Sequence, residues 1–143
     1  MESATYVFQV PPQTAPRMTR RDRWKKRPCV VRYFEYRDQL RAKAVEYGIT
    51  LPNAFTVTFY MAMPKSWSKK KKAAHVGKPC QSKPDLDNVL KGFMDALRTN
   101  DASVYAVSAS KFWSEQPGVL LTAPPPSHAL LPRWVESTSL AGY

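Results

Sequence analysis

A strict alternation of side chains between Phe55 and Met63 constrains the fold of this chain more than any other feature of its sequence. Phe, Val, Phe, Met and Met occupy every second position, whereas Thr, Thr, Tyr and Ala stand between them. Successive side chains of a β-strand point to opposite faces of a sheet, so the pattern predicts a strand with one well-buried face. Pro64 ends the strand, because proline has no N–H to donate to a neighbouring strand.

Two segments repeat apolar residues at spacings of three and four, which is typical of a helix with one buried face. The first is Arg32–Tyr47, and Gly48 is a natural stop just after it. The second is Leu86–Leu97. Their predicted buried faces are Tyr33, Tyr36, Leu40, Ala44 and Tyr47 in the first helix, and Leu86, Leu90, Phe93, Met94 and Leu97 in the second.

Three more segments have strand patterns, namely Thr5–Val10, Val104–Trp113 and Gly118–Thr122, and we predict that the last two pair with each other. The order of these elements predicts an α+β fold in a single domain, with one mixed β-sheet and two helices packed on it. We assign residues 1–122 to the domain and 123–143 to a proline-rich C-terminal tail, which packs on the domain or on a partner, or stays loose. The larger apolar residues of that tail are Leu130, Leu131, Trp134 and Val135.

The formal net charge of +11 favours a polyanionic partner. Nucleic acid is a better candidate than acidic lipid, since the sequence has no long basic amphipathic helix; a basic protein that is merely soluble is the alternative. The charge concentrates in a basic arm over residues 11–28 and a basic loop over 65–83, and we expect this loop to be mobile without DNA. The expected DNA-binding residues are Arg17, Arg20, Arg21, Arg23, Lys25, Lys26, Lys69, Lys70, Lys71, Lys72 and Lys83.

Trp24 and Trp67 lie within these two basic segments. Each is a candidate for stacking on an unpaired base, and each is equally well explained as a packing residue. No apolar run is long enough for a transmembrane helix, and the N-terminus lacks a signal-peptide layout, so a cytoplasmic protein is expected. Cys29, Cys80, His75 and His128 show no paired-ligand spacing, which favours reduced thiols over a zinc site.

Four of the eleven acidic residues, Asp85, Asp87, Asp95 and Asp101, lie within one short stretch. Carboxylates that repel one another are stabilised by a cation between them, and such oxygen donors suit Mg²⁺ or Mn²⁺. Asp85 and Asp87 are spaced to point the same way. If the following strand runs antiparallel to the helix, Asp101 starts about 15 Å from Asp87. Either the loop before Asp101 then doubles back, or the third acid is supplied differently.

The acids also have a purely structural explanation. Asp85 and Asp87 stand where a helix N-cap and its first turn are expected, and acidic groups there complement the helix dipole. Asp87, Lys91 and Asp95 follow one another at spacings of four, so they also fit a ladder of surface ion pairs worth a few tenths of a kcal/mol each.

The stretch Lys83-Pro-Asp-Leu-Asp-Asn-Val-Leu-Lys-Gly-Phe-Met-Asp-Ala-Leu97, followed by Asn100-Asp-Ala-Ser-Val104 and Lys111, resembles the RusA family of Holliday-junction resolvases, often carried by phages and prophages. The resemblance implies a homodimer that resolves four-way DNA junctions by paired symmetric nicks in DNA recombination and repair, without a small-molecule cofactor. It implies that Asp85, Asp87 and Asp101 bind Mg²⁺ and that Lys91 assists catalysis. Asn100 departs from the family, which often has an acid there.

Three other functions fit the same residues. One is a nuclease acting more broadly on branched DNA, such as forks and flaps. The second is a basic DNA-binding protein without catalytic activity, and the third is a scaffold that uses the basic surface and the tail for assembly. A cytoplasmic location, in the host if the chain is phage-encoded, suits the nuclease.

Overall fold

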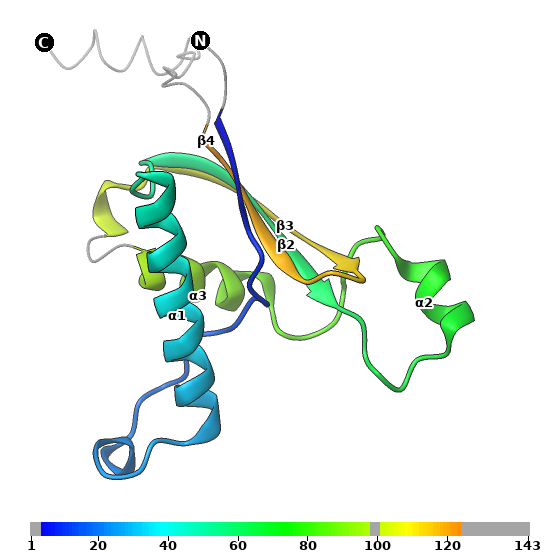
Figure 1. Ribbon diagram of the computed structural model, residues 1–143, viewed down its shortest axis with the longest axis horizontal. Helices are drawn as coiled ribbons and strands as arrows, with labels where there is room; N and C mark the ends of the chain where they lie inside the picture. Colours follow the sequence, from blue (N-terminus) through cyan, green and yellow to red (C-terminus); the bar gives the residue numbers. More distant parts are fainter. Residues whose placement is uncertain (1–3, 98–100, 124–143) are drawn as a thin grey trace, which may run out of the picture.

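The computed structural model describes residues 4–97 and 101–123 and consists of one four-stranded sheet with helices packed on it (Figure 1). The confirmed expectations are the α+β class and the mixed sheet. The main elements are β1 (Ala4–Phe8), α1 (Pro28–Tyr47), β2 (Ala54–Ala62), α3 (Leu86–Leu97), β3 (Ala106–Ser114) and β4 (Gly118–Ala123). Three short helices complete them: the 3-10 turns η1 (Arg20–Arg23) and η2 (Asp101–Ser103), and α2 (Lys69–His75).

The strands lie in the order β1-β4-β2-β3. β2 and β3 are parallel, whereas β4 is antiparallel to both β1 and β2. The predicted pairing of β4 with β3 is therefore wrong. β4 is a central strand because its Val119 and Leu121 are fully buried, while β3 carries three serines and a lysine and suits the sheet edge that it occupies.

The core lies between the sheet and the helices α1 and α3. The predicted buried face of β2 is confirmed, with Phe55, Val57 and Phe59 at most 2% exposed. Phe93 of α3 is fully buried, and its ring centroid lies 5.8 Å from that of Phe59 and 6.3 Å from that of Phe8. These rings fix α3 against the sheet.

Helix α1 begins at Pro28, earlier than the predicted start at Arg32. Proline is favoured in the first turn of a helix, where its missing N–H has no partner to lose. The helix ends at Gly48 as predicted, and this glycine adopts a left-handed conformation with φ of 70°. Along its buried face, Tyr33, Tyr36, Leu40 and Ala44 are buried as expected, whereas Tyr47, predicted to be buried, is exposed in the last turn.

The basic segment 65–83, predicted as a loop, contains helix α2. The hydroxyl of Ser68 accepts a hydrogen bond from the Lys71 N–H at 3.1 Å and caps the helix. The Trp67 ring packs against two other rings: its centroid lies 4.7 Å from that of His75 in α2 and 5.0 Å from that of Trp113 in β3. This aromatic contact joins residues that are distant in the sequence, so a sequence pattern read locally does not reveal it. The mobility of the segment stays a prediction.

The C-terminal tail over 123–143, with Leu130, Leu131, Trp134 and Val135, lies outside the described residues apart from Ala123. Within the described part of the chain, no helix has both the length and the apolar character needed to cross a membrane.

Two buried tyrosines of α1 provide a matched test of the packing. The Tyr33 hydroxyl donates to the Gly92 carbonyl at 2.9 Å, whereas the Tyr36 hydroxyl is buried without a partner among the described residues. Burial raises the pKa of Tyr36, so this side chain stays neutral at any ordinary pH. We expect Tyr33→Phe to lower the free energy of unfolding by about 1 kcal/mol and Tyr36→Phe to leave it unchanged or raise it. Urea unfolding of both variants measures the difference, and a larger loss in Tyr36→Phe would contradict it.

Candidate active site and nucleic-acid interface

The acidic pair lies where α3 begins. Asp85 directly precedes the helix, and its carbonyl accepts a hydrogen bond from the Val89 N–H at 3.1 Å. Asp87 lies in the first turn. Both side chains are exposed, whereas Leu86 between them packs against the core. The structure therefore presents the two carboxylates to solvent from a helix end that the core holds in place.

Lys111 of β3 ties down the chain that leads to this pair. Its ammonium donates hydrogen bonds to the carbonyl of Ser82 at 2.7 Å and to that of Pro84 at 2.6 Å. The Lys111 carbonyl accepts one from the Cys80 N–H at 3.0 Å. The residues just before Asp85 are thus fixed to the sheet edge by three hydrogen bonds, so the position of the acidic pair follows that of β3.

The beginning of the basic arm crosses α3 at Gly92. A Cβ atom at this position would lie 2.8 Å from the Gln13 carbonyl oxygen and 3.1 Å from the Ala15 nitrogen. Only glycine allows the backbone of the arm to approach the helix this closely. The arm is therefore held beside the helix that carries the acidic pair.

Lys91 lies one turn after Asp87 on α3 and is exposed. Its ammonium is 3.7 Å from a carboxylate oxygen of Asp95, so part of the predicted ion-pair ladder is present. A surface pair of this kind contributes only a few tenths of a kcal/mol. The contact therefore leaves the Lys91 side chain able to turn toward another anion.

Asp101 is the first residue of η2, which follows the end of α3 opposite to Asp85 and Asp87 (Figure 1). Lys111 of β3 lies beside the start of α3, and Ala106, where β3 begins, is about 16 Å earlier along the strand. β3 therefore runs antiparallel to α3, and the residues before it lie near the helix C-terminus. Asp85 and Asp87 lie two residues apart at the start of α3, whereas the backbone of Asp101 follows the end of that helix. The side chain of Asp101, and Asn100, lie outside the described residues.

No cluster of three or more His, Cys, Asp or Glu side chains suited to a metal ion occurs among the described residues. The predicted set of Asp85, Asp87 and Asp101 stays a prediction, because the Asp101 side chain lies outside the described residues. The chemistry of the two exposed carboxylates fits Mg²⁺ or Mn²⁺, since hard oxygen donors are what these ions prefer.

The basic arm contains a fixed turn built around Asp22, the one charged side chain that is buried in the described part of the chain, at 2% exposed. Its carboxylate accepts hydrogen bonds from the Thr19 N–H at 2.8 Å and the Thr19 hydroxyl at 3.0 Å. The Arg27 guanidinium donates to the same carboxylate at 3.1 and 3.2 Å and to the Arg17 carbonyl at 2.6 Å. The Arg27 guanidinium, followed by Thr19, holds the pKa of Asp22 well below its usual range.

Sequence reasoning missed Asp22. A single acid within a run of basic residues, three positions after a threonine, is a usable signal, because this spacing lets the two residues cap one turn reciprocally.

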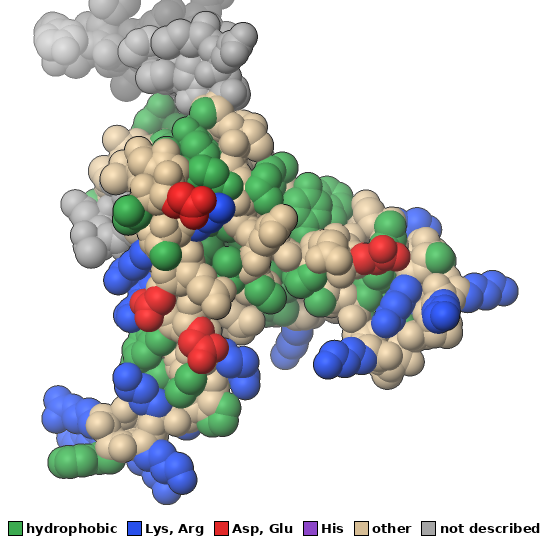
Figure 2. Space-filling view, viewed as in Figure 1, with side chains coloured by type: hydrophobic (Ala, Val, Ile, Leu, Met, Phe, Trp, Pro, Cys, Tyr) green, Lys and Arg blue, Asp and Glu red, His purple; other side chains and the backbone are tan. Residues whose placement is uncertain are grey.

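All the predicted DNA-binding residues except Lys83 form two groups, on the arm and on α2, and Lys83 lies between α2 and α3. Figure 2 shows Lys and Arg side chains gathered over these two regions, on either side of the part of the molecule where α3 begins in Figure 1. The exposed members are Arg17, Arg20, Arg21, Arg23, Lys25, Lys26, Lys69, Lys70, Lys71 and Lys83, and Lys72 is half-buried.

An exposed carboxylate pair between two basic surfaces on an α+β domain offers oxygen donors for a divalent ion and positive charge for a polyanion. The family model described as Endodeoxyribonuclease RusA matches residues 8–122, and the chain belongs to that family. The resemblance inferred from the acidic motif is thereby confirmed. Uncharacterized protein YqaN of Bacillus subtilis (strain 168) is 44% identical over 80 residues, a match that covers 50% of this chain and 56% of that protein. The chain thus spans little more than half the length of this relative.

The Asp22 turn predicts a specific loss of order in the arm. We expect Asp22→Asn to make the arm several-fold more sensitive to trypsin at neutral pH, because the Arg27 ion pair and two bonds to Thr19 depend on the carboxylate. The pKa of Asp22 is lowered in the folded state, so its stabilising contribution is present above the usual carboxyl pKa and is lost as the pH falls toward the lowered value.

The matched control is Asp38→Asn, which removes an exposed acid whose partner among the described residues is its neighbour Arg37, at 3.1 Å. Its digestion rate should equal that of the parent chain. Equal rates for Asp22→Asn and the parent would show that the carboxylate does not order the arm.

Proposed function

We propose that this chain is a divalent-metal-dependent endonuclease that resolves four-way DNA junctions by paired nicks in DNA recombination and repair. The observation that carries the proposal is the exposed pair Asp85 and Asp87, held at a core-anchored helix end between two basic surfaces. Membership of the RusA family supports it. The proposed activity is exerted in the cytoplasm, where recombining DNA lies, and in the host cytoplasm if the chain is phage-encoded.

Asp85 and Asp87 would hold Mg²⁺ or Mn²⁺, with Asp101 as the third ligand. An ion held there would supply positive charge to the attacked phosphate and would make a bound water easier to deprotonate. The residues of the chain orient the groups around it: Lys111 fixes the backbone before Asp85, and Lys91 adds a positive charge at the phosphate once it leaves Asp95.

The position of Asp101 at the far end of α3 supports a site shared between two copies of the chain. An isologous dimer places the same surface of both copies in contact, so it brings the start of one α3 near the end of the other when the two helices are antiparallel. Asp101 of one copy would then join Asp85 and Asp87 of its partner. Two equivalent sites follow from this symmetry, and they account for paired nicks in two strands.

The arm and α2 would bind the phosphates on either side of the acidic pair. Binding through so many lysines and arginines falls steeply as salt is raised, whatever the DNA sequence. Selectivity for a junction then comes from its shape, because only a branched substrate presents two strands to two active sites at once.

The activity is tested with a labelled four-way junction, a fork and a linear duplex at equal salt. We expect Mg²⁺-dependent cleavage of the junction, and loss of that cleavage by at least about a thousandfold in Asp87→Asn, because a metal ligand is removed. Junction binding by the variant should remain, since the basic surfaces are unchanged. Asp38→Asn on α1, another exposed acid that lies far from α3 in sequence, is the control and should cut normally.

Two results would contradict the proposal in different ways. Equal cutting of fork and junction would replace it with the broader branched-DNA nuclease. Junction binding without any metal-dependent cleavage by the parent chain would replace it with the non-catalytic DNA-binding protein.

A further inference from the structure

Trp24 is the most exposed of the large apolar side chains that the structure describes, at 90%. It directly follows η1 in the basic arm. An exposed indole offers a large, rigid apolar face to a ligand or a partner, and tryptophan is enriched at binding surfaces for this reason.

The turn that carries Trp24 is well ordered. The backbone N–H of Trp24 donates a hydrogen bond to the Arg21 carbonyl at 3.0 Å, and the backbone N–H of Lys25 donates to the same oxygen at 2.9 Å. The buried Asp22 holds the chain on both sides, through Thr19 before Trp24 and Arg27 after it. The ring is therefore presented from a fixed backbone, which lowers the entropy cost of binding a ligand against it.

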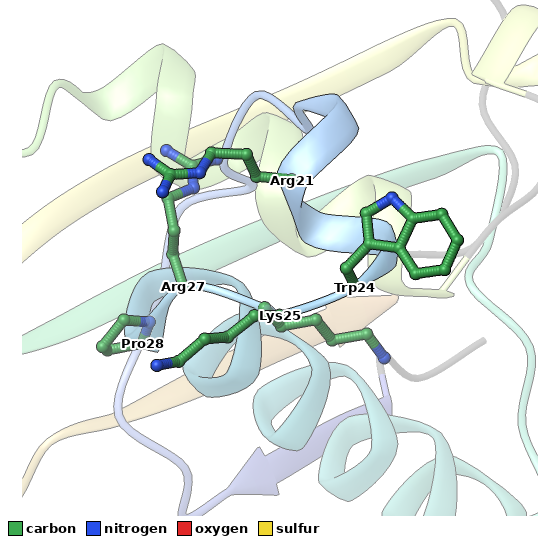
Figure 3. Close-up of a pocket in the computed structure, with 6 residues that line it drawn as sticks. Arg21, Trp24, Lys25, Arg27 and Pro28 are labelled. Atoms are coloured by element: carbon green, nitrogen blue, oxygen red, sulfur yellow. The ribbon is translucent and has the colours of Figure 1, made fainter.

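The surroundings of the ring are apolar and positively charged. A hollow of about 440 Å³ is lined by Arg21, Trp24, Lys25, Lys26, Arg27 and Pro28 (Figure 3). In that view the indole extends to the side opposite Arg21 and Arg27. A ligand that suits an indole face beside several cations has an aromatic ring and an anionic group, as a nucleotide has.

The second tryptophan of the basic segments is used differently. Trp67 packs on Trp113 and His75, and the Lys71 ammonium lies 4.5 Å from its ring centroid. These contacts fix α2 to the sheet and leave Trp67 half-buried. Of the two candidates that the sequence offered for stacking, only Trp24 has a ring open to a ligand.

We propose that Trp24 is a stacking platform for an unpaired DNA base, with Arg21 and Lys25 binding the phosphates beside that base. The inference rests on the proposed function in taking DNA as the ligand. Bases inside a linear duplex are already stacked on both faces, whereas a base at a branch point is free to leave the stack. Trp24 would therefore add selectivity for branched DNA beyond what the shape of a dimer provides.

The test measures binding in the full chain with Asp87→Asn, so that no DNA is cut. A four-way junction carries the fluorescent base 2-aminopurine at its branch point, and a second junction carries it in the middle of one arm. We expect the Asp87→Asn protein to quench the fluorophore at the branch point and not the fluorophore placed in the middle of a DNA duplex arm. Adding Trp24→Ala should abolish the quenching and weaken junction binding about tenfold, while duplex affinity changes less than about twofold.

Three further variants separate stacking from other roles. Trp24→Phe keeps an aromatic face and should retain most of the quenching. Val45→Ala removes another exposed apolar side chain, on α1, and should change nothing. Arg21→Ala should weaken junction and duplex binding by similar factors, because a phosphate contact does not distinguish them. Trp24→Ala should melt at the parental temperature, because its ring is almost fully exposed.

The inference is overturned if Trp24→Ala leaves the quenching intact. It is also overturned if Trp24→Ala weakens junction and duplex binding by equal factors, or weakens neither of them. Failure of this inference can be distinguished from failure of the proposed nuclease activity. If the parent chain cuts no junction, a gapped duplex with 2-aminopurine in the gap still reports stacking, through quenching that is present in the parent and absent in Trp24→Ala.

Discussion

The burial of one face of α3 against the sheet and α1 fixes where every candidate site residue lies. Val89, Phe93 and Ala96 are fully buried, and the Phe93 ring contributes about 2 kcal/mol or more of hydrophobic stabilisation by itself. On the other side, Gly92 admits the backbone of the arm. The helix cannot slide or turn without opening this packing, so the acidic pair at its start keeps one position relative to both basic surfaces.

The same packing sets the main difficulty for the chemistry. β3 returns along α3 in the opposite direction, so Asp101 follows the end of the helix while Asp85 and Asp87 stand at its start. A single copy of the chain therefore offers a pair of carboxylates, and the third ligand implied by the family is at the far end. The shared site that we propose for a symmetric dimer would resolve this difficulty without moving any buried element, and it would make metal binding dependent on assembly.

Local patterns in the sequence were sufficient for the main helices and strands. The alternation in β2, the helical spacing in α1 and the glycine after it all describe short-range geometry, and the structure confirms them. Features that depend on distant contacts were beyond such patterns. Helix α2 needs Trp113 from another strand, and the central place of β4 follows from pairing on both of its sides. The Asp22 turn was missed because its charge was counted within a basic run and its partners were not considered.

The most direct measurement of the shared-site account mixes two inactive chains. Asp87→Asn and Asp101→Asn proteins are unfolded together and refolded, and mass-tagged chains verify that mixed dimers form. The account predicts one intact site in each mixed dimer, and hence single nicks in a four-way junction. The mixture should contain about a quarter as many active sites as the same amount of the parent protein. A mixture as inactive as either variant by itself, with mixed dimers present, would contradict it, because each site would then draw all its acids from one chain.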